Sequence, residues 1–421
     1  MKKFFAYLLV FLISSGLALV LAYKHDLYTW EKPQQNMWIQ GGTLFDATSE
    51  FAISNPGVLV ADGKIACLGE SCNVTEKTLI IDATGKSIMP GLIDLHGHFF
   101  GGKEQSKHDN MLNTIWAQLR FLPSVRQDLI QAGVTSYRSL GDIAPAIFDL
   151  KKSLSQDKLA GPRLFVAGPI FTVAGGHPTQ RKDIPAWVLK QMTFQSDSPE
   201  QITTKIEQLM LQGIDGIKVV YQGHTDSVND IEMPRISRET LATITSLAEK
   251  NGLWVAAHTG GQNETIEAIN TGVTSVEHGI RHGNIIRQET LDAVANNQVT
   301  YVPTLAREPK GHLNIPHLAQ SNIMLGVGTD SPVKEHDQYS YHMELKRLVD
   351  AGLSDTQAVI AATRNGAIAL KKSKQLGTIE QGKLADILII NGRPWDNISD
   401  IKKIDTVIIN GRIGYSVNQA D

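Results

Sequence analysis

Fold and chemistry meet in one stretch of the sequence, Pro90-Gly91-Leu92-Ile93-Asp94-Leu95-His96-Gly97-His98. Its apolar residues predict a buried strand, and side chains two apart on a strand project from the same face. We therefore expect His96 and His98 to point at one spot, where neutral imidazoles bind metals such as zinc. Gly97 between them would let the backbone approach whatever they hold. A lone pair of histidines is also common on surfaces, so this interpretation needs partners at other strand ends.

Length and composition limit the possible folds and partners. The chain has 421 residues, enough for one α/β barrel with an additional small domain. Hydrophobic residues make up 42% and charged residues 20%, with a net charge of −3. This balance is typical of a globular body with a large core, and it lacks the basic surface that nucleic-acid binding needs. We therefore expect no nucleic-acid partner.

The N-terminal segment predicts export. Lys2 and Lys3 precede an uncharged run over 4–23, which is long enough to cross a bilayer and also typical of a secretory signal. Small residues fit cleavage after Ala22, whereas the length fits a retained anchor, so residues 1–22 are interpreted as a signal peptide or a membrane anchor. The positive N-terminus places the body on the periplasmic or extracellular side, with an inner-membrane contact only through an uncleaved segment.

The chain has two cysteines, Cys67 and Cys72. In an exported protein they could close a small loop as a disulfide, and the alternative is a pair of free thiols. Two thiols are too few for a four-cysteine zinc site.

Both ends of the chain have the same β-rich pattern. Short strands with turns fill residues 36–89, with a hairpin signal at Asp62-Gly63, and the pattern returns over 372–416. We predict that these two segments form one small β-sandwich domain.

The middle of the chain, residues 90–371, alternates apolar β-branched runs with amphipathic helical stretches. This alternation predicts an α/β fold of the (β/α)8 TIM-barrel type. After the opening stretch, strands are expected at 134–140, 163–168, 216–220, 253–258, 274–278, 299–303 and 324–330, and helices at 200–212, 238–251, 265–272 and 355–370.

Polar residues at strand ends are the candidates for chemistry, because active sites of such barrels lie at the carboxyl ends of the strands. The expected strands place Lys218, His258, His278 and Asp330 there. A lysine inside an apolar strand is costly to bury as a cation. Each residue alone could be a hydrogen-bonded core residue, but their coincidence favours a metal site.

In these motifs the sequence resembles the amidohydrolase superfamily, in particular its imidazolonepropionase-like and prolidase-like branch. The resemblance covers essentially everything after the N-terminal hydrophobic run. Besides the opening stretch with Met89, it rests on Gly133-Val134-Thr135-Ser136, Gly175-Gly176-His177, Ile217-Lys218-Val219, His258, Glu277-His278-Gly279, Gly328-Thr329-Asp330, Ala362-Thr363-Arg364-Asn365-Gly366-Ala367 and the tail over 377–386.

The resemblance implies a centre of two zinc ions per chain with a hydroxide between them. The implied ligands are His96, His98 and Asp330 for one ion, His258 and His278 for the other, and Lys218 as an N-carboxylated bridge. A carbamate turns the lysine into a two-oxygen anion, which a pair of dications favours. Zinc brings the pKa of bound water to roughly 7. Asp330 and Lys218 are thus the expected catalytic residues, with Asp330 passing a proton from the attacking water to the departing amine.

The resemblance also implies a substrate, a small peptide or N-acyl amino acid with a free carboxylate. Prolidase-like relatives place a histidine and a tyrosine against the carboxylate of a dipeptide, in motifs that correspond to His177 and Tyr221. Arg281, three residues past His278, would add a charge-assisted bond. The alternative is that these residues only satisfy loop carbonyls.

Two departures from the family pattern stand out. Many relatives have Arg-Asp after the second strand, whereas this chain has Arg138-Ser139-Leu140-Gly141-Asp142, so the role of that aspartate is open. The stretch 305–323 looks shorter than in many relatives, which predicts an open mouth. The remaining singled-out histidines are expected at the surface: His108, His224, His282, His312 and His317.

Several other functions compete with cleavage of a linear amide. The same centre could open a cyclic amide, as in imidazolonepropionase-like relatives, or cleave a lactone, an ester or a phosphotriester. A catalytically inactive scaffold is disfavoured because every expected ligand is present. A single-metal deaminase is disfavoured by Lys218, since that branch uses a glutamate acid near the fifth strand and no bridging lysine. The sequence leaves open whether the chain forms a homo-oligomer.

Overall fold

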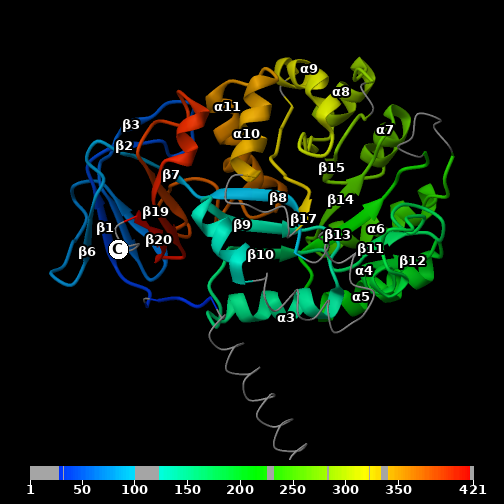
Figure 1. Cartoon of the computed structure of the whole chain (residues 1–421), viewed down its shortest axis with the longest axis horizontal. Coiled ribbons are helices and arrows are strands. Elements are labelled where there is room, and N and C mark those ends of the chain that lie inside the picture. Colours follow the sequence, from blue (N-terminus) through cyan, green and yellow to red (C-terminus); the bar gives the residue numbers. More distant parts are fainter. Residues whose placement is uncertain are drawn as a thin grey trace, which may run out of the picture.

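The computed structural model describes residues 28–31, 33–99, 123–224, 232–281, 284–321, 323–332 and 340–417. The predicted signal peptide or anchor, residues 1–22, lies outside these ranges. Among the residues that are described, no helix is long and apolar enough to cross a bilayer. The chain has a mixed α/β fold, with a β-rich unit beside a larger part in which strands and helices alternate (Figure 1).

The β-rich unit takes its strands from both ends of the chain. One sheet has the order β5-β4-β1-β6 and the other β20-β19-β18-β7-β2-β3. A single hydrophobic cluster contains side chains of both sheets, including Ile39 and Val60 from the first and Ile88 and Ile389 from the second. The strands are β1 (Met37–Gln40), β2 (Thr43–Leu44), β3 (Ile53–Ser54), β4 (Val58–Ala61), β5 (Lys64–Leu68), β6 (Leu79–Asp82), β7 (Ser87–Pro90), β18 (Ile387–Ile390), β19 (Ile404–Ile409) and β20 (Arg412–Ser416).

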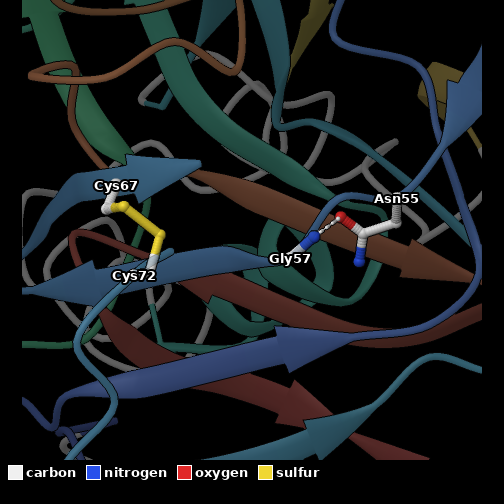
Figure 2. Close-up of a disulfide and its surroundings, with 4 residues drawn as sticks. All are labelled: Asn55, Gly57, Cys67 and Cys72. Atoms are coloured by element: carbon white, nitrogen blue, oxygen red, sulfur yellow. Dashed lines mark hydrogen bonds between the residues drawn. A yellow bond between two sulfur atoms is a disulfide. The ribbon is translucent and has the colours of Figure 1, made fainter. Parts of the chain in front are cut away.

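A disulfide joins Cys67 in β5 to Cys72 in the turn that follows (Figure 2). Of the two alternatives that the sequence left open, the structure has the disulfide. Near it, Asn55 Oδ1 accepts a hydrogen bond of 2.9 Å from the Gly57 amide (Figure 2). Gly57 has a φ of +97°, and a Cβ there would collide with the Trp38 ring, so this turn requires glycine.

The larger part contains two sheets of parallel strands, in the orders β10-β9-β8-β17 and β12-β11-β13-β14-β15-β16. The strands are β8 (Leu92–His98), β9 (Val134–Ser139), β10 (Arg163–Val166), β11 (Ile170–Thr172), β12 (Thr193–Gln195), β13 (Gly216–Val220), β14 (Trp254–His258), β15 (Ser275–Glu277), β16 (Thr300–Val302) and β17 (Ser331–Pro332). The helices are α3 (Ala144–Ser155), α4 (Ala186–Met192), α5 (Pro199–Leu211), α6 (Arg238–Lys250), α7 (Gln262–Asn270), α8 (Gln288–Asn296), α9 (Ile315–Gln320), α10 (Ser340–Asp350), α11 (Asp355–Ala362) and α12 (Arg364–Ala369), with 3-10 helices η2 (Pro309–Asn314) and η4 (Ile398–Lys402).

Backbone hydrogen bonds link the two sheets at two places. On one side the Asp215 amide donates to Val166 O at 2.9 Å. On the other, the stretch 324–330 lies between β16 and β8, where the Tyr301 amide donates to Met324 O and the Leu95 amide to Val327 O, each at 2.9 Å. This stretch was predicted to be a full strand, but it makes only an isolated bridge between Tyr301 and Leu325 before β17 begins. A Cβ at Gly326 would lie 2.4 Å from the Leu95 side chain and one at Gly328 would lie 2.6 Å from the His96 side chain, so the close packing of this stretch on β8 requires glycine at both positions.

The helices follow from ordinary local signals. Ser198 caps α5 by accepting a hydrogen bond from the Gln201 amide, and Pro199 occupies the first turn, where it costs no hydrogen bond. The helix predicted over 355–370 is instead divided into α11 and α12 at Thr363, whose ψ is −89°. The Thr363 hydroxyl donates to Val359 O at 2.7 Å, a bond that competes with the regular helical pattern.

Candidate metal centre

His96, His98 and Asp330 meet at the carboxyl end of β8. The Nε2 atoms of the two histidines lie 3.3 and 3.1 Å from Asp330 Oδ1, so the two imidazoles do point at one spot. Asp330 is brought there by its own amide, which donates to His96 O at 2.7 Å, and by a left-handed backbone with a φ of +48°. His96, His278 and Asp330 each offer a ligand atom within 4.8 Å of the others, a spacing that suits one metal ion.

His258 and His278 complete the cluster from the next strands. His258 is the last residue of β14, and His278 follows β15 with a φ of +66°. The ring centroids lie 4.4 Å apart, and the His278 centroid lies 4.8 Å from that of His96. The imidazoles of both predicted half-sites therefore form one continuous group.

Lys218 lies within β13 and is 2% exposed. Its Nζ makes no hydrogen bond to any residue that the structure describes. Burial lowers the pKa of Lys218 to about 8, because the charged form loses its hydration. A buried amine without a partner is unfavourable, so this position suits a covalent or ionic partner that the polypeptide itself does not supply.

The protonation states of three imidazoles and of Asp330 fit metal binding. Burial lowers the pKa of His96 to about 4 and the pKa values of His258 and His278 well below their ordinary range, so these imidazoles are neutral at neutral pH. Burial also opposes charge on His98, but the hydrogen bond and charge of Asp330 outweigh it and raise the pKa of His98. Burial alone would raise the pKa of Asp330; the neighbouring His96 and His98 lower it, so Asp330 is a carboxylate.

The structure adds a pair that we did not predict from sequence, Glu277 and Arg138. Glu277 Oε2 accepts a hydrogen bond of 2.8 Å from His96 Nδ1, and Oε1 lies 2.7 Å from Arg138 Nη2, with both side chains fully buried. Although burial opposes its charge, Arg138 lowers the pKa of Glu277 to about 2. The bond to Nδ1 leaves His96 Nε2 as the atom that faces the centre.

Other side chains contact the remaining two histidines. His278 Nδ1 lies 2.6 Å from Thr304 Oγ1, and His258 Nε2 lies 2.7 Å from Gln222 Oε1. Arg281 Nη1 lies 3.1 Å from the same nitrogen of His258. The amide oxygen can only accept and the guanidinium can only donate, so only one of these two groups forms a hydrogen bond with His258 Nε2 in a given tautomer. Both contacts are made to Nε2 and leave Nδ1 of His258 for a metal.

Two aspartates support the backbone around the cluster. Asp94 accepts hydrogen bonds from the His96 amide at 3.0 Å and from the Thr329 hydroxyl at 2.9 Å, which ties β8 to the residue before Asp330. Asp142, whose role the sequence left open, accepts from the Phe99 amide at 3.1 Å. His98 Nδ1 donates to the neighbouring Gly141 O at 3.2 Å, so this loop supports the second histidine through its backbone.

Glycine is required at position 97 for a different reason than we expected from the sequence. A Cβ at this position would come within 1.8 Å of Tyr137 Oη, so glycine makes room for a buried tyrosine. Successive side chains alternate along β8, and Gly97 therefore faces away from the side shared by His96 and His98.

The structure brings two of the three predicted substrate-binding residues to the cluster. The His177 ring stacks on His258 with centroids 4.9 Å apart, and Arg281 reaches the same histidine. For Tyr221 the structure shows a different contact. Its buried ring packs under the Arg235 guanidinium, 4.2 Å from the ring centroid. Tyr221 follows Lys218 by three positions and lies one residue beyond β13.

Of the histidines expected at the surface, His224, His312 and His317 are exposed, while His108 and His282 lie outside the described residues. The stretch 305–323 forms η2 and α9.

Comparisons with known proteins show which sequences and folds this chain is similar to. Residues 87–414 match the model of the amidohydrolase family. The 5'-deoxyadenosine deaminase of Methanothermobacter thermautotrophicus is 25% identical, over 90% of this chain and 93% of its own length. The ochratoxinase of Aspergillus niger is 22% identical, over 86% and 82%. Among solved structures, a Xaa-Pro dipeptidase with bound methionine is similar with a TM-score of 0.77 and 25% identity, over 90% of this chain and 100% of that one.

Proposed function

The chain belongs to the amidohydrolase family, and from this premise we propose that it cleaves the amide bond of a small peptide or N-acyl amino acid. The family and its named relatives, a deaminase and a dipeptidase among them, make the chain a hydrolase of carbon–nitrogen bonds. The observation that carries the finer proposal is a buried lysine amine, without a hydrogen-bond partner among the described residues, beside four histidines and a carboxylate. This donor set is suited to metal ions and poorly suited to a substrate alone.

We further propose that the centre holds two zinc ions. His96, His98 and Asp330 would bind one ion and His258 and His278 the other, with Lys218 carboxylated between them. Neutral imidazoles and an ionised Asp330 are the forms that bind metal. Carboxylation replaces the buried cation by an anion with two oxygens, which removes the unfavourable amine. When bound, the zinc ions would lower the pKa of water and polarise the scissile carbonyl.

Asp330 is the residue that we propose for proton transfer. Asp330 is a carboxylate and lies at hydrogen-bonding distance from two imidazoles. In this proposal it accepts the proton of the attacking water and passes it to the leaving amine. We place these residues at the mouth of a (β/α)8 barrel over 90–371, beside a β-sandwich domain of residues 36–89 and 372–416. Two sets of backbone hydrogen bonds support a closed barrel. One joins β10 to the segment before β13, and the other joins 324–330 to β16 and β8.

For the substrate we propose a free carboxylate, read by His177 and Arg281. Both lie against His258, so a substrate bound at the centre would reach them. His177→Ala should lower kcat/KM for a carboxylate substrate by about tenfold to a hundredfold, the value of one charge-assisted contact. The test repeats the assay with the carboxylate amidated, where the loss should vanish. Tyr221→Phe, assayed in the same way, decides whether the third predicted residue takes part.

The chemistry of the centre also permits other substrates, namely a cyclic amide, a lactone or an ester. A deaminase is a further candidate because a deaminase is among the similar proteins. A panel of dipeptides, N-acyl amino acids, lactones and deoxyadenosine derivatives separates them, with ammonia release scored beside amine release. Ammonia from the nucleoside and no cleavage of any dipeptide or N-acyl amino acid would replace the peptidase proposal by deamination.

We also propose that the catalytic body is exported, through Lys2, Lys3 and the run over 4–23. A reporter that is active only outside the cytoplasm, fused at residue 23 or beyond, should give signal. A silent fusion beside an active cytoplasmic reporter at the same position would reject export.

A further inference from the structure

The turn that follows β16 touches the candidate centre at several points. Thr304 contacts His278, as described above, and Arg307 Nε donates to Asp330 O at 2.9 Å. Glu308, the next residue, forms an ion pair with Arg281. A buried carboxylate on α10, Glu344, fixes this turn by accepting hydrogen bonds from backbone amides at 305 and 306. The position of Glu308 is therefore set by the scaffold.

The Arg281–Glu308 pair lies beside the proposed position of the substrate. The two side chains are only 10% and 12% exposed. Nη1 of Arg281 faces His258 Nε2 at 3.1 Å, while Nη2 donates to Glu308 Oε1. The guanidinium thus has one edge toward the cluster and another edge held by a carboxylate of the chain itself.

This arrangement places two anions in competition. A substrate carboxylate that bonds to Arg281 must share the guanidinium with Glu308 or displace it. Because both side chains are mostly buried, salt and water screen the repulsion between the carboxylates less than they would at a surface. The attraction of Arg281 for an anion is therefore reduced in advance by Glu308.

We propose that Glu308 is a specificity-determining residue, which sets how strongly the centre prefers an acid over the corresponding neutral amide. This inference rests on the proposed function, in which Arg281 reads a substrate carboxylate. Glu308 lowers the preference for acids, so that neutral substrates compete with anionic ones. Removing its charge while keeping its shape should release Arg281 and shift the selectivity toward acids.

The experiment compares full-length, zinc-loaded wild type with Glu308→Gln. The probes are N-acetyl-L-methionine and its carboxamide. The ratio of kcat/KM for the acid to kcat/KM for the amide should rise about tenfold or more in Glu308→Gln, as expected when a charged contact becomes available. Glu308→Asp keeps the charge and should return the ratio toward that of wild type. Glu289→Gln removes an equal charge from an exposed position on α8 and should leave the ratio unchanged.

A ratio that stays constant or falls in Glu308→Gln, or that rises equally in Glu289→Gln, overturns the inference. If wild type cleaves neither probe, calorimetric Kd values for the two probes give a second measure that requires no turnover. Failure of wild type to cleave either probe or any dipeptide would contradict the proposed function. The ratio of the two Kd values would then still decide the role of Glu308. No change in that ratio between wild type and Glu308→Gln rejects the role outright.

Discussion

The two halves of the candidate centre are built from similar ligands but held in place differently. On the side of His96, the orienting group is a carboxylate, Glu277, which Arg138 fixes at 2.7 Å in a fully buried pair. On the side of His278, the orienting group is the hydroxyl of Thr304. A buried ion pair therefore supports His96, whereas a neutral hydroxyl supports His278.

The difference has a consequence for metal binding. A carboxylate that accepts a hydrogen bond from a ligating imidazole raises the basicity of the ligand, whereas a hydroxyl or amide does so less. The His96 half also contains the carboxylate of Asp330. We therefore expect the ion bound by His96, His98 and Asp330 to be held more tightly than the ion bound by His258 and His278.

The largest effect is expected from Lys218, the residue that both halves would share. Lys218→Ala should abolish activity and lower the metal content to below two equivalents, because the bridge between the ions is lost. Short carboxylic acids should restore part of the activity by occupying the space of the carbamate. Steady-state assays with and without acetate, together with elemental analysis, check this. A Lys218→Ala enzyme of normal activity would refute the bridge.

Asp330→Asn should separate chemistry from metal binding. The amide still coordinates weakly but cannot carry a proton, so kcat should fall by about 10²–10⁴-fold, as for other general acid–base groups. Metal content should fall far less. Turnover that survives within about tenfold of wild type would require a different general base.

Glu277→Gln tests the charged half. The substitution removes the acceptor charge behind His96 and leaves Arg138 buried without its partner, so the tighter ion should weaken by about a hundredfold. Breaking a buried ion pair typically costs about 3–5 kcal/mol of folding free energy, so thermal unfolding of metal-free protein is measured alongside. Unchanged affinity for the tighter ion would show that Glu277 only stabilises the fold.

Thr304→Val tests the neutral half with an isosteric change. Losing the hydroxyl should weaken the second ion by about tenfold, the lower end of the range for such orienting groups, and leave the first ion unaffected. Thr304→Ser keeps the hydroxyl and serves as the matched control. Competition with a metallochromic chelator measures both affinities. Equal losses in the valine and serine variants would assign the effect to packing.

The candidate ligands could be chosen from the sequence because a simple periodicity places them at strand ends. His96 and His98 share a strand face, and Lys218, His258 and Asp330 lie at or near the ends of apolar runs. The part that Tyr221 plays, three positions after Lys218 and just beyond β13, stays a prediction.

The orienting residues were not accessible, because they depend on backbone conformations that the sequence does not mark. Alternation along β15 would send Glu277 and His278 to opposite faces. The left-handed backbone of His278, with a φ of +66°, places both at the centre. Thr304 reaches His278 with a φ of +48°, again at a residue other than glycine. The mixed α/β fold was predictable from alternating patterns, whereas the irregular stretch 324–330 was not.

A stepwise metal titration tests the central claim most directly. Metal-free, full-length protein is titrated with Zn²⁺, and bound metal, heat and activity are measured at each step. The account predicts about two equivalents per chain in two steps of different affinity, with activity appearing in proportion to the second. One equivalent at full activity would contradict a centre built from both halves, and two indistinguishable equivalents would contradict the difference between them.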